Sequence, residues 1–119
     1  MKKEDKLSDL SMQLSVDVIP LCKKLRLQGE DVIAKQLYRS ATSICANIAE
    51  SKYGQSRADF ISKLEIALKE TNETDRWLTI LYKSKLIDEE LFNKLHRPCA
   101  TIRFLLIKSV TTAKKNASK

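Results

Sequence analysis

The chain has 119 residues, and its two glycines and two prolines are too few for an all-β fold with many turns, so the composition favours a single all-α domain. Its net charge of +7 suits contact with phosphate or acidic surfaces, although charge also serves solubility. Three scattered cysteines (Cys22, Cys45 and Cys99) argue against a secreted disulfide framework, and no apolar run has the length of a signal peptide or a membrane span. We therefore expect a soluble, cytoplasmic protein in which the cysteines are small buried apolar residues.

The first helix is predicted from about Leu7 to Leu27, because leucine and valine recur on one helical stripe. Pro20 interrupts this stretch, and proline removes an amide and clashes with the carbonyl four residues earlier. We expect a kink or a split near Ile19. Gly29 then ends the helix, since glycine tolerates the left-handed conformation that closes one.

The second helix is predicted over about residues 31–50, with isoleucine, leucine and alanine on its core side. Near its end, Asn47 and Glu50 are expected to form hydrogen bonds that hold this helix against the third. Residues 51–55 form a short connection, so the second and third helices should be an antiparallel pair.

The third helix organises the chain and is predicted to begin after Ser56, whose side chain caps it while Asp59 lies at the positive end of the helix dipole. It should end near Ser84. Spacings of alternately four and three residues keep one side of it toward partner helices. The residues at these spacings are Phe60, Leu64, Ala67, Thr71, Thr74, Leu78 and Leu81.

The fourth helix is predicted from the Asp88 cap to about Ala113, with a bend at Pro98. The whole chain then forms one domain, residues 1–119, with frayed ends at about 1–6 and 114–119. Four amphipathic helices joined by short connections predict an antiparallel up-down-up-down four-helix bundle.

Two of the predicted helices carry apolar residues outside their core side. A monomer would leave this second face exposed to water, so we expect a homo-oligomer. The candidate subunit interface consists of Ile66, Trp77, Ile80, Phe104 and Ile107.

The positive charge is concentrated near the C-terminus. Lys94, Arg97, Lys108 and Lys115 project within about 60° of one another on a helix, with Phe104 beside them. This basic stripe is the candidate site for RNA or DNA; the alternative is an ordinary solvated helix face.

Several short motifs resemble the signature of one bacterial family. They are Ile44-Cys45-Ala46-Asn47-Ile48-Ala49-Glu50, Ser56, Asp59-Phe60, Ile66-Ala67-Leu68, Asn72-Glu73 and Trp77-Leu78, and the match spans about Gln36 to Ile87. The family is the group of four-helix-bundle proteins that includes those encoded in intervening sequences of 23S ribosomal RNA genes. Ser51 stands where many members carry glycine, so the second helix is expected to continue slightly further before Gly54.

The resemblance implies a ring-like homopentamer without established catalytic activity. It also implies a relationship to the accessory variability determinant of diversity-generating retroelements, which binds nucleic acid and works beside a reverse transcriptase. The motif residues interpreted as structural are Asn47, Glu50, Ser56, Asp59, Asn72 and Glu73.

No arrangement typical of an enzyme is evident. His96 is the single histidine and lacks the Glu-x-x-His partners of a carboxylate-bridged metal centre, so no metal or cofactor is expected. Glu50, Glu70 and Glu73 could in principle gather as general acids or bases, but ion pairs and hydrogen bonds are the preferred interpretation. Two hypotheses remain: a basic oligomer that binds nucleic acid without strong sequence specificity, and an oligomeric scaffold for another protein.

Overall fold

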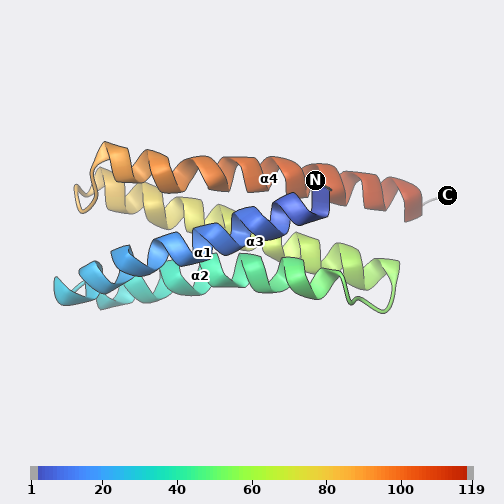
Figure 1. Ribbon diagram of the computed structural model, residues 1–119, viewed down its shortest axis with the longest axis horizontal. Helices are drawn as coiled ribbons and strands as arrows, with labels where there is room; N and C mark the ends of the chain where they lie inside the picture. The colour runs from blue at the N-terminus through green and yellow to red at the C-terminus, as the bar shows by residue number, and fades with distance from the viewer. Residues whose placement is uncertain (1–2, 118–119) are drawn as a thin grey trace.

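The computed structural model describes residues 3–117, and within them the chain forms four α-helices and no strand. These are α1 (Lys3–Leu27), α2 (Asp31–Ser51), α3 (Arg57–Lys83) and α4 (Glu89–Ala117). Successive helices run in opposite directions, so the start of α1, the end of α4 and the α2–α3 connection lie toward the same end of the bundle, which measures 52 × 23 × 22 Å (Figure 1).

Each helix packs against two neighbours. Helix α2 packs beside α1 and α3, and α4 packs beside α3 and α1, whereas the described parts of the diagonal pairs, α1 with α3 and α2 with α4, do not approach closely along their backbones. This arrangement confirms the predicted antiparallel up-down-up-down four-helix bundle.

The core runs along the bundle axis and receives side chains from all four helices. Leu14, Leu37, Leu78 and Leu106, one from each helix, have at most 1% of their surface exposed. Burial of a leucine side chain contributes about 1.5–3 kcal/mol, so this shared apolar seam accounts for why four amphipathic helices associate.

The predicted helix starts are confirmed by side-chain caps. The backbone N–H of Asp59 donates to Ser56 Oγ at 3.1 Å, and the N–H of Leu91 donates to Asp88 Oδ1 at 2.8 Å. Each bond satisfies an amide that the first turn of a helix leaves without a backbone partner.

Helices α1 and α3 are each closed by a residue in the left-handed conformation. Gly29 has a φ of 84°, as predicted for the residue that ends α1. Lys85 has a φ of 65° after α3, which the sequence does not reveal because a lysine adopts this conformation only at a steric cost.

Neither internal proline divides a helix. Of the kink or split expected near Ile19, the split does not occur, since α1 continues through Pro20, and α4 likewise continues through Pro98. Pro20 and Val16 both face solvent, so water can solvate the carbonyl that the proline leaves without an amide partner. The extension of α2 through Ser51 agrees with the prediction made from the missing glycine.

Helix α4 extends further than expected. It reaches Ala117, although the sequence favoured an end near Ala113 and frayed residues beyond it. Ala113 is buried, and Lys114 Nζ forms an ion pair with Glu65 Oε2 of α3 at 2.8 Å. These two contacts hold the last turns against the bundle.

Candidate nucleic-acid interface

The outer face of α4 carries the predicted basic stripe. Lys94, Arg97, Lys108 and Lys115 are all exposed, and α4 is continuous through all four positions. At 100° per residue these side chains leave the same side of the helix. No aspartate or glutamate follows Glu90 in the sequence, so the field along this face is positive over most of the helix.

An aromatic ring lies within the stripe. Phe104 has 60% of its surface exposed, whereas Phe60 and Phe92, the other two phenylalanines, pack against the core. Lys108 Nζ lies 5.4 Å from the centre of the Phe104 ring, within the range of a cation–π interaction. The ring is therefore an exposed apolar surface with a cation beside it.

A polar cluster joins α3 to α4 next to this face. Asp75 Oδ1 lies 2.5 Å from His96 Nδ1, within hydrogen-bond distance, and Asp75 Oδ2 forms an ion pair with Arg103 Nη1 at 3.4 Å. Arg103 also donates to Asn72 Oδ1 at 3.4 Å. Phe92 stacks on His96 and on Tyr82, with ring centres 4.9 and 4.7 Å apart. Arg103 is thus half-buried in contacts with α3, whereas Lys94, Arg97, Lys108 and Lys115 are exposed.

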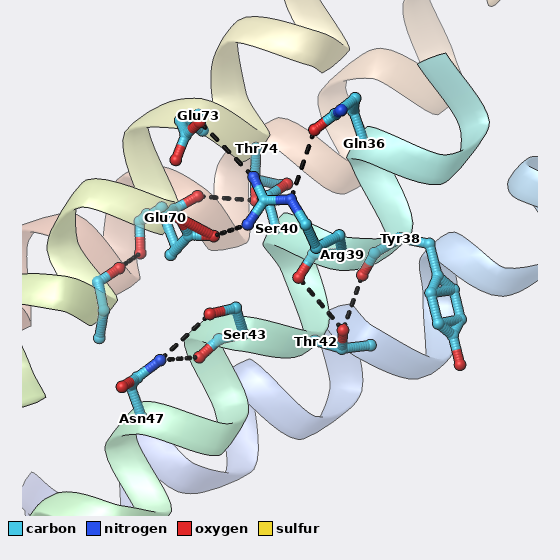
Figure 2. Close-up of polar contacts among 12 residues, drawn as sticks. Gln36, Tyr38, Arg39, Ser40, Thr42, Ser43, Asn47, Glu70, Glu73 and Thr74 are labelled. Atoms are coloured by element: carbon cyan, nitrogen blue, oxygen red, sulfur yellow. Dashed lines mark hydrogen bonds and ion pairs between the residues drawn. The ribbon is translucent and has the colours of Figure 1, made fainter. Parts of the chain in front are cut away.

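A second polar cluster joins α2 to α3, as Figure 2 shows. Arg39 Nη1 lies 2.7 Å from Glu70 Oε2, and Arg39 Nη2 lies 3.5 Å from Glu73 Oε1. Next to them, Thr74 Oγ1 lies 2.8 Å from Ser40 Oγ, and both residues are fully buried. These contacts agree with the interpretation of Glu70 and Glu73 as ion-pairing residues.

Glu70 is the buried carboxylate of the described chain, with 6% of its surface exposed. Loss of solvation raises its pKa, and the neighbouring Glu73 adds to the rise, while Arg39 opposes it. Arg39 and its role were not predicted, because the sequence does not show how α2 is rotated relative to α3.

The adjacent motif residues Asn72 and Glu73 contact different helices. Asn72 meets α4 through Arg103, and Glu73 meets α2 through Arg39. Consecutive helical residues point about 100° apart, so a pair on the outer side of α3 can reach both neighbours.

The predicted link from Asn47 to α3 is wrong. Its amide Nδ2 donates to Ser43 O at 2.9 Å and to Ser43 Oγ at 3.1 Å, both one turn earlier in the same helix (Figure 2). Glu50 does reach α3, where it forms an exposed ion pair with Lys63 at 3.4 Å. An amide one turn after a serine finds its acceptors within α2 and needs no partner helix.

The candidate interface residues differ in exposure. Ile66, Ile80, Phe104 and Ile107 are exposed by 40–60%, as a second apolar face requires. Trp77 is half-buried against the core, and its indole Nε1 is buried without a hydrogen-bond partner among the described residues. Whether these residues contact another subunit stays a prediction.

The three thiols are all free, with Cys22 and Cys99 buried and Cys45 half-buried. Burial, with Asp75 nearby, raises the pKa of Cys99 to about 12. Across the described residues there is no group of three or more histidine, cysteine, aspartate or glutamate side chains suited to hold a metal ion. In that same part of the chain no helix has the length and apolarity to cross a membrane.

Fold and surface together define an antiparallel four-helix-bundle protein with a cationic outer face on its last helix. The model of the 23S rRNA-intervening sequence protein family matches residues 3–108, and the chain belongs to this family. It is similar to a protein of unknown function from the S23 ribosomal protein family of Bacteroides thetaiotaomicron VPI-5482, known from a crystal structure. That similarity has 42% identity and a TM-score of 0.88, and covers 92% of this chain and 99% of the other. No curated protein matches the chain.

Proposed function

We propose that this protein is a non-enzymatic homo-oligomer that binds RNA or DNA through the outer face of α4 without strong sequence specificity. The observation that carries the proposal is the row of exposed cations on α4, Lys94, Arg97, Lys108 and Lys115, in a helix that has no acidic residue after Glu90. Cations on a regular helix face neutralise phosphates irrespective of base sequence.

Oligomerisation would multiply this surface. Ile66 and Ile80 of α3 and Ile107 of α4 are exposed apolar residues, and Trp77 holds a buried indole N–H that lacks an acceptor within the described bundle. A subunit interface that covers the isoleucines would remove apolar surface from water. The resemblance of the sequence motifs to a pentameric relative favours a ring of five. Repetition of a weak phosphate-binding face around a ring raises the overall affinity.

The first experiment measures binding of labelled RNA and DNA by fluorescence anisotropy at low salt. A variant with Lys94→Glu, Arg97→Glu and Lys108→Glu is expected to lose about 100-fold in affinity, since each exposed contact is worth up to about 1 kcal/mol and reversal adds repulsion. The matched control makes the same change of charge at the exposed cations that end α1, with Lys23→Glu, Lys24→Glu and Arg26→Glu.

The control is expected to bind nearly as tightly as the wild type. An equal loss in both variants would mean that net charge alone governs binding and would contradict the assignment to α4. Affinity should also fall steeply with salt, because phosphate contacts release counterions.

The second experiment measures the mass of the assembly by light scattering. Ile66→Glu with Ile80→Glu is expected to dissociate it, because two charges cannot be buried in an apolar interface. Met12→Glu on α1, which is 57% exposed and lies on the helix diagonally opposite α3 in the described bundle, is the control and should leave the mass unchanged. A wild-type mass near the 13.6 kDa of the single chain would reject the oligomer.

A protein-binding scaffold is the second candidate, because the exposed isoleucines of α3 would equally suit a partner protein. Failure of the wild type to bind any nucleic acid at low salt would favour it. A reverse transcriptase as that partner stays a prediction from the resemblance.

A further inference from the structure

Phe104 differs from the other apolar residues assigned to a subunit interface. It is 60% exposed on a helix whose neighbouring outward residues include Arg97 and Lys108, and Lys108 Nζ lies 5.4 Å from the ring centre. On an ideal helix Arg97 is about 10 Å and Lys108 about 6 Å away along the axis, in opposite directions. The ring therefore lies between two cations on one face.

This setting does not suit an apolar contact between subunits. Burial of the ring would also remove water from the Lys108 ammonium group that rests on it, and an ammonium group buried without an anion is costly. A ligand that brings an anion together with an apolar face would satisfy both groups.

We propose that Phe104 is a stacking platform for a base of single-stranded nucleic acid, with Arg97 and Lys108 contacting the phosphates on either side. This inference rests on the proposed function and names its ligand more narrowly. Exposed aromatic rings within a cationic groove or face are how proteins hold single strands without reading their sequence, because every base has a π-face.

A duplex would not use this ring in the same way. In a duplex the bases stack on one another and present only their edges in the grooves, so the flat face of Phe104 would find no partner except at an end. The cations, by contrast, would contact the phosphates of either form. The ring therefore selects single strands, while the stripe supplies affinity common to both.

The experiment compares two probes of equal length and charge: an oligouridylate and an abasic oligomer that has the sugar–phosphate backbone without bases. Wild type is expected to bind the oligouridylate more tightly. Phe104→Ala should weaken oligouridylate binding by about 5- to 150-fold and leave abasic binding nearly unchanged. Phe104→Leu, which keeps apolar area without a π-face, should behave like alanine, whereas Phe104→Trp should retain binding.

Other outcomes would overturn the inference. Equal losses of affinity for both probes would mean that Phe104 only positions Lys108. A smaller assembly mass in Phe104→Ala would mean that Phe104 is part of the subunit interface. If wild type binds both probes equally and the charge-reversed variant binds neither, the stacking role fails while the proposed function stands. If wild type binds no probe, both fail.

Discussion

Helices α3 and α4 are antiparallel neighbours of similar length, 27 and 29 residues, but their charged side chains have different surroundings. Acids of α3 pair with side chains of the helices on either side: Glu70 and Glu73 with Arg39 of α2, and Asp75 with Arg103 and the imidazole of His96 of α4. The outer face of α4 instead presents cations without interspersed acids.

This difference separates charges that hold neighbouring helices together from charges that face solvent. Arg103 and Arg97 are both arginines of α4, yet Arg103 is half-buried against Asp75 whereas Arg97 projects into solvent. Arginine content alone would not distinguish them; the direction of each side chain relative to α3 does. Substitution of a charge paired between helices should change stability, and substitution of a solvent-facing charge on α4 should change nucleic-acid binding.

The largest expected effect on stability is at Arg39. Arg39→Ala leaves the buried Glu70 carboxylate without its cation, and because Arg39 is itself 47% exposed we expect a loss of about 1–2 kcal/mol rather than the full cost of breaking a buried pair. Urea unfolding monitored by circular dichroism measures this loss of stability. Arg76→Ala, an exposed change on α3, is the control and should stay within about 0.5 kcal/mol. Equal effects would remove the distinction between paired and solvated charges.

Glu70 also predicts how stability depends on pH. Its pKa is raised in the folded state, so the folded protein holds this proton more tightly than the unfolded chain, and stability falls as pH rises above the ordinary value of 4.5 until the folded pKa is passed. Glu70→Gln removes the titration. The free energy of unfolding of this variant should therefore increase relative to that of wild type as the pH rises from acidic to neutral. A difference that stays constant with pH would show that folding does not shift the pKa of Glu70.

The smallest effect is expected at Asn47. Among the described residues its amide bonds only to Ser43 of its own helix, so Asn47→Ala should change the free energy of unfolding by about a few tenths of a kcal/mol. The better helix propensity of alanine opposes the lost bonds. The same urea titration applies. A loss above about 1 kcal/mol would indicate a partner outside the bundle, such as a second subunit.

The helices and caps could be predicted from the sequence because their signals are local. Core spacing, the Ser56 and Asp88 caps and Gly29 each act within a few residues of the chain. The Arg39–Glu70 and Arg103–Asp75 contacts could not, since they depend on how neighbouring helices are rotated about their axes. The Asn47 prediction was wrong for a related reason. Nothing in the motif shows whether the amide side chain bonds to its own helix or to the next one.

The candidate site was predictable in part. The common direction of Lys94, Arg97, Lys108 and Lys115 follows from helical geometry alone. The contact of Lys108 with Phe104 has the four-residue spacing that brings side chains together on a helix, which was the available signal. The spacing does not show whether the Phe104 ring is exposed or buried against another helix. Only the folded structure shows that it is exposed.

Lysine footprinting tests the division between α3 and α4 most directly. The protein is acetylated with a water-soluble ester at low salt, with and without an oligouridylate, and the modified positions are quantified by mass spectrometry. Lys94 and Lys108 of α4 should become protected when the oligonucleotide binds, whereas Lys69 and Lys83, exposed on α3, should react equally in both samples. Protection of the α3 lysines with unchanged reactivity on α4 would contradict the assignment of the nucleic-acid interface to α4.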